Sequence, residues 1–112
     1  AVVLVASGTS DERARADVAA TAGRWAEQRG VVVRHAFVAG GGPHVADAVT
    51  DARSEVGADG VVALAPYLFE DGVLLDRATR AARAAGVDVV AAGLAAAPEV
   101  VDLVLVRARS AT

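Results

Sequence analysis

The stretch that decides the fold is AVVLVASGTSDE, residues 1–12. A valine-rich apolar run ends at a Ser-Gly-Thr-Ser turn, and an Arg/Ala/Asp-rich stretch with helical periodicity follows it. This order predicts a strand, a tight turn and a helix. In an open parallel sheet such a turn lies at the carboxyl end of its strand, where ligands bind at the topological switch point. We therefore expect the functional edge of the domain at this turn.

The same alternation recurs along the whole chain. Nearly continuous apolar runs predict four strands buried on both faces, at residues 1–6, 31–38, 60–65 and 87–92. Helical periodicity after each run predicts four helices, at residues 11–29, 43–57, 72–85 and from 98 toward 109. The pattern predicts a single α/β domain over residues 1–112, a three-layer α/β/α sandwich with a four-stranded, mainly parallel sheet in the flavodoxin-like order 2-1-3-4.

Turn chemistry predicts where the helices begin and end. We expect Thr9 and Glu12 to form a capping box at the first helix, and Pro43 to occupy the first turn of the second. Glycines are expected to end the first three helices: Gly30, Gly57 and Gly86. The strand pattern predicts a core that includes Val3, Val5, Val33, Phe37, Val62, Leu64 and Val89.

Composition excludes several classes of function. The chain has 54% hydrophobic residues and a formal net charge of -3, which argues against nucleic-acid or anionic-membrane partners. It contains no cysteine, and therefore neither disulfides nor thiolate metal sites. All its basic residues are arginines, and without lysine the first loop is not a P-loop. No apolar run reaches the roughly 18 residues of a membrane span, and no signal peptide precedes the first strand. We expect a cytoplasmic protein.

Two loops are expected to form opposite lips of one cleft at the functional edge. The candidates for lining it are Ser7, Gly8, Thr9, Tyr67, Phe69, Glu70 and Asp71. Tyr67 and Phe69 could stack on a planar ligand or cap the core at the end of the third strand. The first loop could hold an anion on the amides of the helix that follows, or it could serve only as the cap of that helix.

The sequence contains few candidate metal ligands. His44, expected at the start of the second helix on the functional edge, is the metal-ligand candidate, with Glu70 and Asp71 in a neighbouring loop. His35 lies inside the second predicted strand, and we interpret it as a structural or partly exposed histidine. No Ser-His-Asp set has its members close enough in the predicted fold to act together.

Four motifs resemble one known family. Residues 4–11, LVASGTSD, resemble the opening of the sirohydrochlorin chelatases (class II cobalto- and ferrochelatases), which reads as an apolar strand followed by [GA]-His-Gly-[ST]-x-Asp. Residues 35–38 and 42–44 are similar to its Val-Ala-Phe strand and its small-Pro-x helix start. Residues 65–74, APYLFEDGVL, resemble its Pro-x-x-Leu-x-x-Gly-x-His segment. The resemblance covers nearly all of the chain in the right order.

The resemblance implies a lyase that inserts Co2+ or Fe2+ into a tetrapyrrole for cobalamin or siroheme synthesis. The metal is then a substrate, and no tightly bound cofactor is implied. The family uses two histidines that face each other across the cleft, whereas this chain has Ser7 and Leu74 at those positions. Serine does not titrate near neutral pH and leucine binds no metal, so we expect the isolated chain to be weak or inactive.

Long members of the family contain two such domains, with the histidines usually in one half. The loop sequence and the start at Ala1, with no methionine, resemble the histidine-poor second half of a two-domain actinobacterial-type enzyme. The expected partners are the tetrapyrrole and a second chelatase-like domain or a homodimer mate. The alternative is a non-catalytic binding or scaffold module that holds an anionic or phosphorylated ligand at residues 7–9.

Overall fold

The computed structural model describes residues 1–8, 10–67 and 72–91. Seven elements alternate along this part of the chain: β1 (Val2–Ala6), α1 (Glu12–Arg29), β2 (Val33–Phe37), α2 (Val45–Val56), β3 (Ala63–Pro66), α3 (Gly72–Ala84) and β4 (Val89–Val90). The expected order of strands and helices is confirmed up to β4. The fourth predicted helix lies outside the described residues.

The sheet has four parallel strands in the order β2-β1-β3-β4, as predicted. The central strand β1 pairs with β2 on one side, where Val2 lies opposite Val33, and with β3 on the other, where Val2 lies opposite Ala63. Because β1 and β3 lie inside the sheet and are buried along their whole length, their sequences carry few polar residues.

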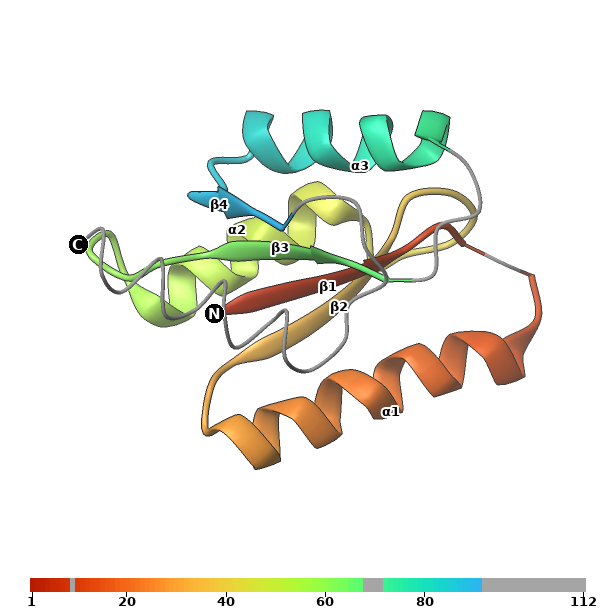
Figure 1. The fold of residues 1–112 in the computed structure, drawn as a ribbon, viewed down its shortest axis with the longest axis horizontal. Coiled ribbons are helices and arrows are strands. Elements are labelled where there is room, and N and C mark those ends of the chain that lie inside the picture. Colours follow the sequence, from red (N-terminus) through yellow and green to blue (C-terminus); the bar gives the residue numbers. More distant parts are fainter. Residues whose placement is uncertain (9, 68–71, 92–112) are drawn as a thin grey trace.

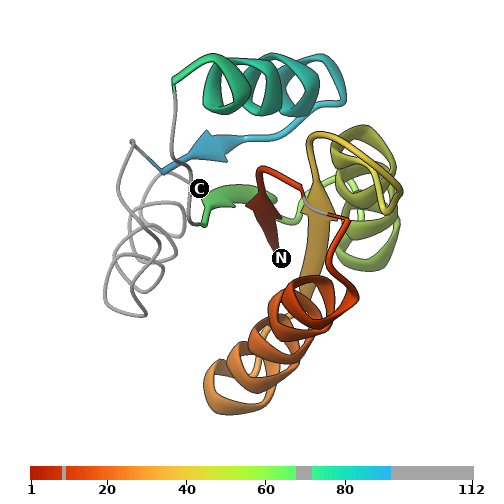
Figure 2. The same ribbon diagram turned by 90° about the vertical axis from the view of Figure 1, so that its right-hand side faces the viewer.

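Helices cover both faces of the sheet, which gives the three predicted layers (Figure 1). Alternate residues of β1 point to opposite faces. Val2 and Leu4 pack against one face of α1, where Val18, Ala22 and Trp25 are buried. The other side of β1 faces α2 and α3, which pack on the sheet through small residues: Ala48, Val49, Ala52, Ala78 and Ala82. Figure 2 shows α1 on one side of the sheet, and α2 and α3 on the other.

Two of the expected helix starts are wrong. The N-cap of α1 is Asp11, whose carboxylate accepts a hydrogen bond from Arg13 N at 2.9 Å, so Glu12 is the first helical residue and cannot close a capping box with Thr9. Helix α2 begins at Val45 and its N-cap is His44. Pro43 precedes the cap because its carbonyl accepts a hydrogen bond from Phe37 N at 2.8 Å, which keeps this residue beside the end of β2.

The predicted core is confirmed for five of its members: Val3, Val5, Phe37, Val62 and Leu64. Val33 and Val89 are only half-buried. Both lie on outer strands, each with one neighbouring strand in the described part of the sheet. Gly30 ends α1 as expected, with a left-handed φ of 64° and a hydrogen bond from its amide to Ala26 O.

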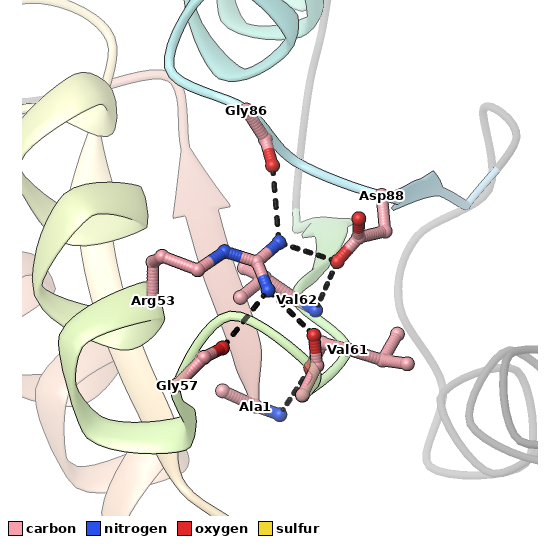
Figure 3. Close-up of polar contacts among 8 residues, drawn as sticks. Ala1, Arg53, Gly57, Val61, Val62, Gly86 and Asp88 are labelled. Carbon is pink, nitrogen blue, oxygen red and sulfur yellow. Dashed lines mark hydrogen bonds and ion pairs between the residues drawn. The ribbon is translucent and has the colours of Figure 1, made fainter. Parts of the chain in front are cut away.

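One arginine joins several segments at the amino edge of the sheet, opposite the loops of interest (Figure 3). Arg53, in the last turn of α2, donates to the carbonyls of Gly57, Gly60 and Gly86. Its Nη2 also lies 2.5 Å from Asp88 Oδ2. The same carboxylate oxygen accepts from Val62 N at 2.8 Å. Arg53 and Asp88 therefore tie α2 to the segments that lead into β3 and β4.

Candidate functional site at the carboxyl edge of the sheet

Three loops meet where β1, β2 and β3 end. Ser7 O accepts a hydrogen bond from Ala39 N at 3.1 Å, which continues the pairing of β1 with β2 beyond the strands. Tyr67 N donates to Val5 O at 2.7 Å and so places the loop after β3 on the other side of β1. The loops after the first and third strands therefore begin at neighbouring positions, as the sequence predicted.

Gly8 is required by its contact with the loop after β2. Its φ is 115°, in the region that favours glycine, and a Cβ added to it would lie 2.3 Å from the carbonyl oxygen of Ala39. Because the obstacle is a backbone atom, a side chain cannot be accommodated by a change of rotamer. The glycine of the first motif thus lets two loops of the site touch.

Arg15 holds the glycine-rich loop that carries His44. From α1, its guanidinium donates to Gly41 O at 3.4 Å and also to Gly42 O, and it stacks 4.3 Å from the centre of the Phe37 ring. This combination of hydrogen bonds and a cation–π contact fixes the loop against the end of β2. Arg15 was not among the residues singled out from the sequence.

His44 follows this loop and is exposed. Its side chain makes no capping hydrogen bond with α2, and its ring lies beside Gly42, where an added Cβ would be 3.8 Å from Nε2. Around it, a pocket of about 180 Å³ opens between the end of β2 and helices α2 and α3. The imidazole is therefore available to a ligand at this edge.

The sequence model of the CbiX family matches residues 1–111. The chain belongs to the CbiX family, the sirohydrochlorin chelatases. The parallel sheet and its strand order agree with a chelatase-like fold. Among curated proteins, none matches the chain significantly.

The two positions expected for the CbiX histidines lie on different elements of this edge. Ser7 directly follows β1 and is half-buried, and Leu74 is half-buried in the first turn of α3. Neither side chain carries a nitrogen that could accept a pyrrole proton or bind a metal ion. The other expected cleft residues Thr9, Phe69, Glu70 and Asp71 lie outside the described residues.

Tyr67 is half-buried and packs against the core cluster formed with α1. That contact favours the interpretation of Tyr67 as a cap on the core over a ring free to stack on a planar ligand. The side chain of Tyr67 therefore joins the end of β3 to the core.

His35 lies on β2 and lines a pocket together with Pro43, from the loop before His44. Its ring meets the ring of Phe37 edge-on, with centroids 5.9 Å apart and an interplanar angle of 79°. Burial, and then the positive charge of Arg15, lower the pKa of His35 below its ordinary value of 6.5. The neutral imidazole is therefore favoured.

No group of three or more histidine, cysteine, aspartate or glutamate side chains within residues 1–8, 10–67 and 72–91 could hold a metal ion. In the same residues, no helix is both long enough and apolar enough to cross a bilayer. Glu70 and Asp71, the carboxylates expected to join His44 at a metal site, lie outside the described residues.

Proposed function

We propose that this chain is a domain of a sirohydrochlorin chelatase that inserts Co2+ or Fe2+ into the tetrapyrrole, in cobalamin or siroheme biosynthesis. The observation that carries the proposal is the CbiX match over residues 1–111. It is supported by the meeting of the loops after β1, β2 and β3 at one edge of the sheet, where Ala39 N and Tyr67 N pair with β1. In doubly wound α/β domains this edge binds the ligand.

In the proposed reaction, the divalent metal ion is a substrate and replaces two pyrrole N–H protons. A base must accept these protons, and the metal needs donors until the macrocycle takes it over. Ser7 and Leu74 supply neither function near neutral pH. We therefore assign the histidines to a second chelatase-like domain, whose cleft this chain completes, because a homodimer mate would carry the same Ser7 and Leu74.

The proposed contribution of this chain is a wall of the cleft. The wall comprises the residues that the sequence analysis identified: Ser7, Gly8, Thr9, Tyr67, Phe69, Glu70 and Asp71. Ser7 and Gly8 are suited to this role because small side chains let a flat macrocycle approach the backbone. The contact of Gly8 with Ala39 fixes the shape of the wall before a ligand arrives.

The alternative, an anion held at the start of α1, has less support. Asp11 caps this helix, and its carboxylate accepts the hydrogen bond of Arg13 N. A negative charge already at the helix start repels a second anion at close range. The alternative predicts phosphate binding that Asp11→Asn strengthens, whereas the chelatase proposal predicts no such effect.

The test is the absorbance change of sirohydrochlorin on incubation with Co2+. We expect the chain alone to metallate the macrocycle no faster than the spontaneous reaction. The double variant Ser7→His/Leu74→His should exceed that rate, and the single variants serve as its matched controls. Rapid insertion by the unmodified chain that His44→Ala abolishes would refute the assignment of the histidines to a partner. Failure of the chain to bind the macrocycle at all would refute the proposed function.

A further inference from the structure

The pocket beside His44 has an apolar floor and two polar side chains. Its floor is apolar and is formed by Phe37, Val38, Val45 and Ala81. Its polar side chains are His44, from the loop before α2, and Arg77, from α3. Residues 37–38, residues 44–46 and helix α3 thus line a pocket of about 180 Å³, which is room for a small polar group on a short alkyl stem.

The charge of this pocket is opposite to that of the chain. The chain carries a net charge of -3, yet none of the residues that line the pocket is acidic. Asp47, in the first turn of α2, does not line it. Within the described residues Arg77 forms neither a salt bridge nor a side-chain hydrogen bond, in contrast with Arg53 and Arg34, which are paired with carboxylates. An unpaired guanidinium next to an apolar floor attracts an anion that has an apolar part.

The pocket wall is held in place without a ligand. Arg15 binds the carbonyls of Gly41 and Gly42, and Phe37 N binds Pro43 O at 2.8 Å. The residue that follows this anchored loop is His44. A wall fixed in this way loses little conformational entropy when a ligand binds.

The position of the pocket connects it with the proposed cleft. Arg77 lies three residues after Leu74 on α3, so both side chains occupy the same face of the helix. Leu74 is the position where the family pattern has one of its histidines. A group bound at Arg77 therefore lies about one helical turn from that wall of the cleft.

We propose that His44 and Arg77 form a subsite for a carboxylate on a short alkyl stem, such as the acidic side chains at the rim of a tetrapyrrole. The guanidinium and the imidazole N–H donate to the carboxylate oxygens, and the stem lies on Val38, Val45 and Ala81. The assignment to a tetrapyrrole rests on the proposed function. The preference for a carboxylate is independent of the proposed function, because it follows from the pocket residues alone.

The first experiment uses propionate, with propionamide as its uncharged equivalent. Titration of millimolar propionate into the chain, followed by NMR, should shift the ring signals of His44 in a saturable way, and propionamide should not. Arg77→Gln should weaken binding of propionate at least fivefold. Arg80→Gln makes the same change one turn further along α3, outside the pocket lining, and should alter binding less than twofold. Equal effects of the two substitutions, or equal shifts with propionamide, would overturn the subsite.

The second experiment separates the subsite from the proposed function. A free-base porphyrin with eight carboxylates should displace propionate from the unmodified chain, and Arg77→Gln should bind this porphyrin more weakly than Arg80→Gln does. If propionate binds as expected but the porphyrin neither binds nor competes, the subsite stands and the tetrapyrrole assignment is wrong. If the porphyrin binds equally to both variants, the proposed function stands and the subsite is wrong. Circular dichroism confirms that each variant is folded.

Discussion

Replacing Asp88 by alanine should destabilise the fold far from the candidate site, at the amino edge of the sheet. The carboxylate accepts hydrogen bonds from Val62 N at 2.8 Å and from Arg53 Nη2 at 2.5 Å. Alanine leaves the amide of buried Val62 without this acceptor, which costs about 1–3 kcal/mol. The ion pair adds less, roughly 0–1 kcal/mol, because the Asp88 side chain is 44% exposed and solvent screens it. We expect a loss of about 2 kcal/mol.

The pH dependence gives the prediction a second readout. Burial alone raises the pKa of Asp88, but the hydrogen bond from Val62, the hydrogen bond and charge of Arg53 and the charge of the terminal amino group outweigh it and lower the pKa below 3.8. The folded state therefore favours the carboxylate. This contribution to stability is complete above the unfolded value and is lost as the pH falls through the lower, folded value.

Urea unfolding of Asp88→Ala and of the unmodified chain, at pH 7 and below pH 3, measures both effects. Asp88→Asn should cost less than Asp88→Ala, because the amide oxygen still accepts from Val62 N. Glu55→Gln, which breaks the partly exposed pair with Arg34, is the matched control and should change stability by less than about 0.5 kcal/mol. Equal losses for Asp88→Ala and Glu55→Gln, or a difference that persists undiminished in acid, would refute the reasoning.

Three further outcomes follow from the structure. Gly8→Ala should cost at least about 2 kcal/mol in urea unfolding because of its φ and its contact with Ala39 O, whereas Gly23→Ala, in open space on α1, should be neutral or stabilising. Arg15→Met should raise the pKa of His35 toward 6.5 in an NMR titration and so reduce the loss of stability on acidification below that value; an unchanged pKa would contradict the role of Arg15. Light scattering should report a homodimer that Val73→Asp dissociates, because this valine is 70% exposed at the start of α3; a monomer at high concentration would contradict the prediction.

The arrangement of the strands could be predicted because it depends on continuous apolar runs in the sequence. The runs of valine and alanine in β1 and β3 are buried on both faces, so only a parallel sheet covered by helices accommodates them. The crossover rules then restrict the order of strands to very few possibilities. The residues that cap the helices were harder to predict. Thr9 and Asp11 both cap helices well, and the sequence alone did not favour the aspartate that the structure uses.

The arginines of the site could not be identified from the sequence. All 11 basic residues are arginines, and five of the nine that the structure describes lie at exposed positions of helices with similar neighbours. Arg15 contacts residues 26 and 27 positions away, and Arg77 lines the same pocket as His44 only because α2 and α3 pack side by side. The glycine pattern indicated that position 8 matters, but the atom that excludes a side chain belongs to Ala39.

Both ends of helix α2 are attached to the sheet. Arg53 joins its carboxyl-terminal end to the segments before β3 and β4, and Arg15 holds the loop before its amino-terminal end. The alanines between α2 and α3 form a smooth surface along which helices could otherwise slide. With both ends fastened, shear between these layers would break several arginine contacts together. The structure therefore favours movement of α2 together with the sheet over movement of the helix along the sheet.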